Sequence, residues 1–181
     1  MGSPGPATIS LTAAGSAYGL RRSLGYLAGI VVGTALVLVA VATGITAALL
    51  AVPGLRPVLI AVSAAYILWL AWKVATAPAL AGQAGVSSPS FAGGALLGVA
   101  NPKAWVAIAA VFASARLAHS TATDAAAKAV VLSGMIVLIN SAWLVVGASL
   151  APALRDPRRA RLVNVVLATA LVGAAALAVL H

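Results

Sequence analysis

The residues best suited to chemistry in this chain are Asn101, Pro102 and Lys103, which follow one another inside an apolar run from residue 90 to residue 116. Lys103 lies thirteen residues from each end of that run, which is roughly 20 Å of α-helix and more than half the thickness of a bilayer core. Pro102 has no N–H group, so we predict a helix break that frees backbone polar groups beside the lysine. A membrane tolerates such a break where it lines a cavity, so these three residues predict a functional cavity rather than a packing kink.

The composition of the chain is that of an integral membrane protein. Of its 181 residues, 63% are hydrophobic and 7% are charged, which leaves too little polar surface for a soluble domain of this size. Lysine and arginine number 11 against 2 acidic residues, but the basic residues cluster between apolar runs and so indicate topology rather than nucleic-acid binding. The chain has no cysteine, which excludes disulfides and thiolate metal sites.

The first apolar segment, residues 7–20, is shorter than a membrane span. It follows a proline- and glycine-rich start and is closed by Arg21 and Arg22. It lacks the basic start of a signal peptide. We therefore expect one half of a broken helix, with further apolar residues encoded upstream of Met1.

The next apolar segment, residues 23–55, carries no charge and predicts a full membrane span that ends at Pro53 and Gly54. Three glycines at a spacing of four share one face of this helix and predict the close approach of another helix: Gly25, Gly29 and Gly33.

A third span is predicted from residue 57 to residue 77. Its last turns gather aromatic and basic side chains, which are typical of a membrane-interface belt, with an aromatic cofactor site as the alternative: Tyr66, Trp69, Trp72 and Lys73. Residues 78–89 are rich in glycine and serine and carry no charge, so we expect a connector between two halves of the chain.

The fifth helix is expected to follow the polar turn around His119, which we interpret as solvated, and to run to about residue 150. Asp124 is expected to cap this helix and to pair with Lys128 four residues later. Asn140 lies near its centre, where a buried amide either ties two helices together or contacts a ligand. Residues 155–161 form a basic loop, and residues 162–180 predict a sixth span.

The basic residues divide unequally between the two sides of the membrane. Seven lie in the first, third and fifth loops and three on the other side, with Lys103 as the eleventh, so the positive-inside rule places both termini outside. Division at the connector gives three helices in each half, residues 1–77 and 90–181, and an odd number makes the halves run oppositely. The fold class is therefore all-α and polytopic, with six helices as two inverted three-helix repeats whose proline breaks meet near the midplane.

Three motifs, in this order and spacing, resemble the lysine-exporter translocator family (LysE/RhtB type). They are Ser3-Pro4-Gly5-Pro6-Ala7, Tyr66-Ile67-Leu68-Trp69-Leu70-Ala71-Trp72 and Asn101-Pro102-Lys103-Ala104-Trp105. The resemblance covers essentially the whole chain and implies a six-helix inner-membrane exporter of amino acids and related small metabolites. Carried over to this chain, it implies a pocket of five residues: Gly5, Pro6, Asn101, Pro102 and Lys103. Ala7 departs from the asparagine that many members have.

The leading hypothesis is a secondary exporter of a small zwitterion in the cytoplasmic membrane. Its carboxylate would meet Lys103 and the N-termini of half-helices, while backbone carbonyls and Asn140 take its ammonium. We expect an amino acid and the lipid bilayer as partners, leave a homodimer open, and expect no nucleic acid, cofactor, metal or catalytic residue. The alternatives are a non-transporting membrane scaffold and, far less favoured, an intramembrane hydrolase using Ser133 and His119.

Overall fold

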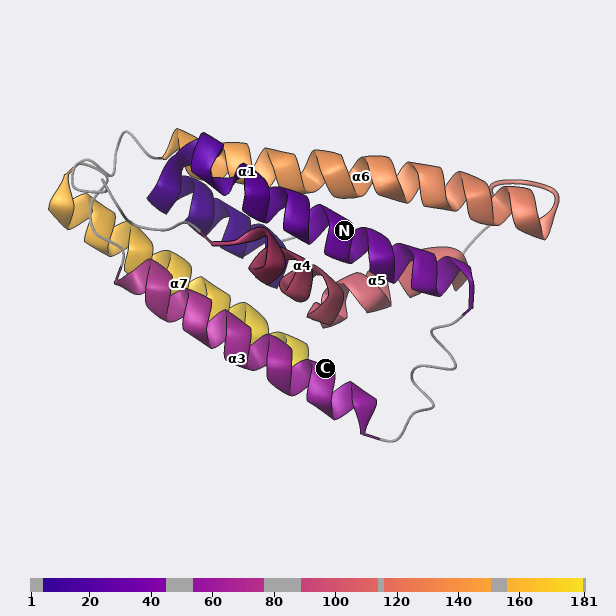
Figure 1. The fold of residues 1–181 in the computed structure, drawn as a ribbon, viewed down its shortest axis with the longest axis horizontal. Coiled ribbons are helices and arrows are strands. Elements are labelled where there is room, and N and C mark those ends of the chain that lie inside the picture. The colour runs from indigo at the N-terminus through magenta and orange to yellow at the C-terminus, as the bar shows by residue number, and fades with distance from the viewer. Residues whose placement is uncertain (1–4, 45–53, 77–88, 114–115, 151–155, 181) are drawn as a thin grey trace.

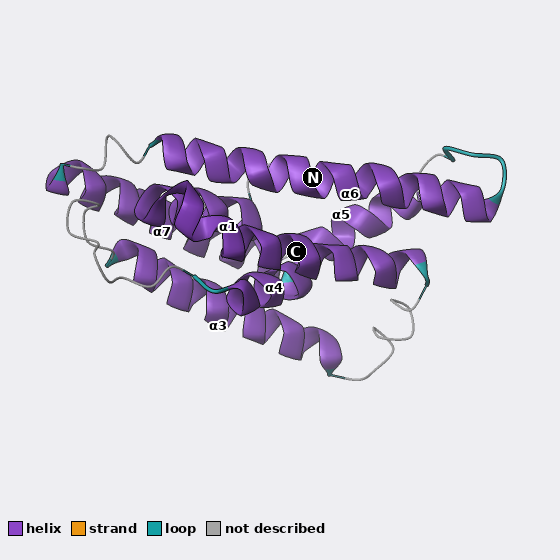
Figure 2. Cartoon of the chain, turned by 45° about the horizontal axis from the view of Figure 1, so that its top comes forward, coloured by secondary structure: helices purple, strands orange, loops and turns teal. Residues whose placement is uncertain are grey.

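The computed structural model describes residues 5–44, 54–76, 89–113, 116–150 and 156–180, and within these residues the chain is all-helical (Figures 1 and 2). The helices are α1 (Pro6–Ala42), α3 (Leu55–Ala75), α4 (Phe91–Ala100), α5 (Pro102–Ala113), α6 (Thr121–Ser149) and α7 (Pro157–Leu180). In this part of the chain, α1 and α6 are each long and apolar enough to cross a membrane, and α4 and α5 together are long and apolar enough as a pair bent by 53°, which is the form of a broken span or of a re-entrant loop. The predicted connector at residues 78–89 falls almost wholly outside the described residues.

Helix α1 is a hairpin of two arms, the first arm at residues 6–18 and the second arm at residues 20–42. Gly19 separates them with φ 77° and ψ 170°, a conformation that glycine adopts without the steric cost of a side chain. The arms pack side by side, because the Tyr26 hydroxyl donates to Ser10 Oγ at 3.1 Å and Ser23 Oγ donates to the carbonyl of Ala14 at 3.0 Å. The two predicted N-terminal helices are therefore present, with the reversal at Gly19.

The second arm ends earlier than the apolar pattern predicts. Its last helical residue is Ala42, whereas the predicted end is at Pro53 and Gly54, and Leu55 begins α3. At the end of the arm, Thr43 N–H donates to the Val39 carbonyl at 3.0 Å, and Gly44 takes φ 75°. A glycine in the left-handed region is a common helix stop, but an uncharged apolar run gives no sign of it.

Two predicted helix starts are also corrected. Ser120, not Asp124, caps α6, since Ser120 Oγ accepts from Thr123 N–H at 3.2 Å. The predicted ion pair is confirmed, with Lys128 Nζ 2.8 Å from Asp124 Oδ2. Helix α7 begins at Pro157 rather than Leu162, because Asp156 Oδ1 accepts from Arg158 N–H at 2.8 Å and proline is favoured in the first turn.

Glycines bring the first arm of α1 against α6 and the second arm against α4. A methyl group at Gly15 would meet the backbone of Leu144 and Ala148, and one at Gly147 would meet that of Thr12. The second arm meets α4 in the same way, through Gly29 and Gly33 on one helix and Gly94 and Gly98 on the other. The predicted close approach is therefore confirmed at Gly29 and Gly33, whereas Gly25 faces open space.

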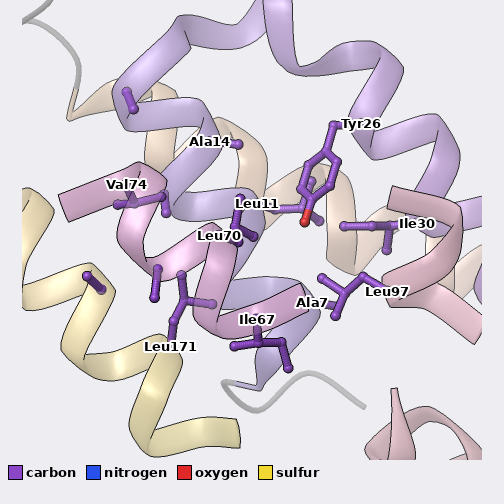
Figure 3. Packing of buried hydrophobic residues seen from close by; sticks show 14 of the residues in the cluster. Ala7, Leu11, Ala14, Tyr26, Ile30, Ile67, Leu70, Val74, Leu97 and Leu171 are labelled. Atoms are coloured by element: carbon purple, nitrogen blue, oxygen red, sulfur yellow. The ribbon is translucent and has the colours of Figure 1, made fainter. Parts of the chain in front are cut away.

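The main hydrophobic core joins both arms of α1 to α3, α4, α6 and α7. Figure 3 shows Tyr26 pointing toward Leu11, with Leu70 and Leu171 on the neighbouring helices. Helices α3 and α7 pack against each other, and α6 lies on the opposite side of the molecule from α3 (Figure 1). This core fixes the first arm of α1, whose N-terminus enters the site described next.

Candidate functional site

The site begins at the break between α4 and α5. Asn101 leaves the helical conformation with φ −73° and ψ 105°, which is the extended backbone that a residue before proline prefers. Pro102 then starts α5. The predicted break is therefore present, and α5 leaves α4 at an angle of 53°.

Polar groups freed by the break are bonded locally. The Asn101 side chain accepts from Lys103 N–H at 3.2 Å, and the Asn101 carbonyl accepts from Ala104 N–H at 3.0 Å. The indole N–H of Trp105 donates to the Val99 carbonyl at 2.6 Å. Buried backbone groups need such partners, so Asn101 and Trp105 stabilise the bent conformation.

The N-terminus of α1 approaches the same point. Gly5 precedes the helix, its N–H donates to Thr8 Oγ1 at 2.9 Å, and Thr8 Oγ1 donates back to the Gly5 carbonyl at 3.1 Å. Pro6 is the first helical residue, a position that costs no hydrogen bond. The first bond within the helix is made by Ile9 N–H to the Gly5 carbonyl, so the N–H groups of Ala7 and Thr8 have no partner inside the helix.

The two breaks are in direct contact. A methyl group added to Gly5 would lie 2.8 Å from Lys103 Cδ and 3.0 Å from Lys103 Nζ. The lysine side chain therefore lies against the Gly5 backbone, which has room for it only because residue 5 has no side chain. This contact joins residues that are almost a hundred positions apart in the sequence.

A cavity of about 60 Å³ opens beside this contact. Its polar lining comes from Gly5 and Thr8 at the start of α1, Thr34 on the second arm, Asn101 and Lys103 at the break, and Asn140 on α6. Its apolar lining is Ala7, Ala104, Ala107, Met135, Ile136 and Ile139. Two helix N-termini, those of α1 and α5, thus meet one cation at one cavity, an arrangement that favours a bound carboxylate.

Asn140 contributes a buried acceptor to this cavity. Its amide nitrogen donates to the Ile136 carbonyl of its own helix at 2.8 Å, and the described residues show no hydrogen bond from Asn140 to another helix. The residue is 8% exposed, and its Oδ1 atom has no hydrogen-bond partner among the described residues. A buried unpaired acceptor is costly, and a donor from a ligand would satisfy it.

Four of the six residues predicted for the site line the cavity: Gly5, Asn101, Lys103 and Asn140. Pro6 and Pro102 are not lining residues but begin α1 and α5. Sequence reasoning missed Thr8 and Thr34 and the apolar residues of α6. Ile136 lies one turn before Asn140 and shares its helix face, which is the signal that could have identified it.

The residues considered for a hydrolase are not brought together. His119 is exposed in the turn before α6, and Ser133 is exposed about 20 Å further along that helix. Neither residue lines the cavity.

Comparison with known proteins identifies the family. The family model described as LysE type translocator matches residues 1–181. The chain belongs to the LysE translocator family. The resemblance seen in the motifs is confirmed, and the cavity of this LysE chain lies where two of those motifs meet.

Among curated proteins, the chain is similar to bacterial cysteine/O-acetylserine efflux proteins. It is 46% identical over 77 residues to the protein of Salmonella choleraesuis (strain SC-B67), covering 42% of this chain and 39% of the relative. It is 40% identical over 76 residues to the protein of Escherichia coli (strain K12), covering 41% and 38%. The match thus spans about two fifths of each relative's length. No solved structure matches the chain.

Proposed function

We propose that this chain is a secondary transporter that exports small amino acids across the cytoplasmic membrane, with the cavity at Gly5 and Lys103 as its substrate site. The observation that carries the proposal is the meeting of two helix N-termini, a lysine and an unpaired amide oxygen at one cavity. The similarity to cysteine/O-acetylserine efflux proteins supports this class of substrate and makes those two compounds the first to test.

The substrate carboxylate binds between the Lys103 ammonium and the start of α1. The N–H groups of Ala7 and Thr8 offer donors there, and the partial positive charge of each helix N-terminus favours an anion. The positive charge of Lys103 is expensive in a membrane interior, and a bound carboxylate offsets that cost.

The substrate ammonium donates to Asn140 Oδ1 on α6. This contact satisfies an acceptor that is otherwise buried without a partner among the described residues. Binding therefore pairs both charged groups of a zwitterion, which is the form of an amino acid at neutral pH. The chain is a transporter rather than an enzyme in this proposal, because the site offers binding groups and no activated nucleophile.

Export of preloaded, labelled cysteine from proteoliposomes tests the proposal. Lys103→Met retains the apolar stem and removes the charge, so we expect normal insertion and at least a tenfold loss of flux. Lys103→Arg keeps the charge with a larger head group, so it should bind substrate and transport it poorly. The control is Arg161→Met, which removes a cation from the exposed start of α7 and should leave flux unchanged.

Parental flux in a normally inserted Lys103→Met variant would show that the lysine is structural and that the substrate site is elsewhere. A wild-type protein that moves no amino acid would instead support the membrane scaffold.

A further inference from the structure

Half of the residues that line the cavity are apolar, and most of these form a wall from α5 and α6. Helix α6 contributes Ile136, which is 4% exposed, and Ile139 one turn before Trp143. Helix α5 contributes Ala104 and Ala107, and Met135 of α6 also lines the cavity, with 38% of its surface exposed. This wall offers methyl and methylene groups to the side chain of a substrate held by its carboxylate and ammonium.

Neither acidic side chain of the chain is available to this wall. The sequence contains only two acidic residues. Asp124 pairs with Lys128 and accepts the N–H groups of Leu117 and Ala118, and it lies about 18 Å along α6 from Ile136. Asp156 caps α7 by accepting the N–H groups of Arg158 and Arg159. A second positive charge in the cavity would consequently find no carboxylate.

A cationic side chain would also meet the field of Lys103 and of two helix N-termini. Like charges repel strongly in a medium of low dielectric constant, and an unpaired charge in an apolar site keeps its full desolvation cost. The charge pattern that favours a carboxylate therefore disfavours the basic side chain of lysine or arginine.

The cavity volume limits the size of the side chain as well. A cavity of about 60 Å³ is small beside the pockets of several hundred Å³ that hold drug-sized ligands. Ile136, Ile139 and Ala107 line it, so a large substrate side chain would meet them.

We infer that this LysE-family site selects amino acids with a small, uncharged side chain and rejects basic ones, with Ile139 and Ile136 as the residues that set the size limit. This inference rests on the proposed export function and names the substrate class of the same site. The selectivity comes from what surrounds the substrate side chain, whereas binding of the backbone groups is common to all amino acids.

Competition in the cysteine flux assay tests whether the site rejects amino acids with a cationic side chain, which we call the charge rule. Alanine and 2,3-diaminopropionate are offered as competitors in mildly acidic buffer, where the second, which is nearly isosteric with cysteine, carries a second ammonium group on its side chain. Alanine should inhibit cysteine flux, and 2,3-diaminopropionate and lysine should inhibit at least tenfold more weakly. Equal inhibition by cysteine's cationic analogue would overturn the inference while leaving the export function intact. The absence of any cysteine flux would contradict both the selectivity inference and the proposed export function.

The role of Ile139 in limiting the size of the substrate side chain, which we call the size rule, is tested with Ile139→Ala. The control is the neighbouring variant Leu138→Ala. Leu138 is 71% exposed and does not line the cavity, so its variant should keep the parental selectivity. Removing the Ile139 side chain should raise the preference for leucine over cysteine by about tenfold, since a few methylene groups in a pocket are worth that much discrimination. An unchanged preference in a normally inserted Ile139→Ala protein contradicts the size rule.

Discussion

The side chain of Trp105 makes a hydrogen bond across the break between α4 and α5. Its indole N–H donates to the Val99 carbonyl at 2.6 Å, which lies on the other side of the break at Pro102. In an unbroken helix this carbonyl would accept from the N–H of Lys103, but that N–H is bonded to Asn101 instead. The bond therefore links α4 to α5 across the break that carries Lys103.

Replacing Trp105 by phenylalanine should keep the aromatic packing and lose this bond. Leaving a part-buried carbonyl unpaired costs about 1–3 kcal/mol, so we expect a lower Tm for the purified protein. The substrate KM should rise more than the maximal flux falls, because the binding groups are less well positioned. A purely structural role of Trp105 would instead lower the Tm and leave KM unchanged.

At the scale of the helix, contacts between glycines and backbone determine which elements can pack together. Gly147 of α6 lies against the Thr12 backbone of α1, and Gly134 on the same helix has open space around it. The two positions provide a matched pair, since the same substitution meets a neighbouring helix at one and nothing at the other.

Alanine should therefore have opposite effects at Gly147 and Gly134. A helix interior favours alanine over glycine by about 1 kcal/mol, so Gly134→Ala should raise the Tm or leave it unchanged. Gly147→Ala must push α1 away from α6, which costs roughly 1–3 kcal/mol of overpacking, and its Tm should fall. Equal Tm values for the two variants would mean that α1 and α6 do not approach as closely as the structure shows.

The break at Pro102 and the ion pair of Asp124 with Lys128 could be predicted from the sequence because both are local. Proline acts on its own helix, and residues four apart lie on the same face. The end of α1 at Ala42 could not be predicted, because its signal is a single threonine and glycine within an apolar run. The lining residues Thr34 and Ile139 were missed because they become neighbours of Lys103 only through helix packing, which no short motif encodes.

The whole molecule shows a crossed pattern of packing between the two halves of the chain. The first helix of each half packs on the second helix of the other half. The first arm of α1 packs on α6, and α4 packs on the second arm of α1. The third helices, α3 and α7, pack on each other. We propose that the halves at residues 1–77 and 90–181 are inverted repeats, and this exchange of equivalent contacts supports the proposal.

Inverted repeats with three helices each imply that the loops after α5 and before α7 lie on opposite sides of the membrane. From the excess of basic residues in the first, third and fifth loops, we predict that the start of α7 lies in the cytoplasm and that both termini lie outside. Because the chain has no cysteine, a single introduced cysteine reports its position without background. In intact cells, a membrane-impermeant thiol reagent should label Arg116→Cys and fail to label Arg158→Cys until the membrane is permeabilised. Both positions are exposed in the folded protein, so protection of position 158 would come from the membrane and not from burial.

The reverse pattern, with position 158 labelled and position 116 protected, would invert the topology. Labelling of both positions from outside would contradict the prediction that a single span, α6, separates them.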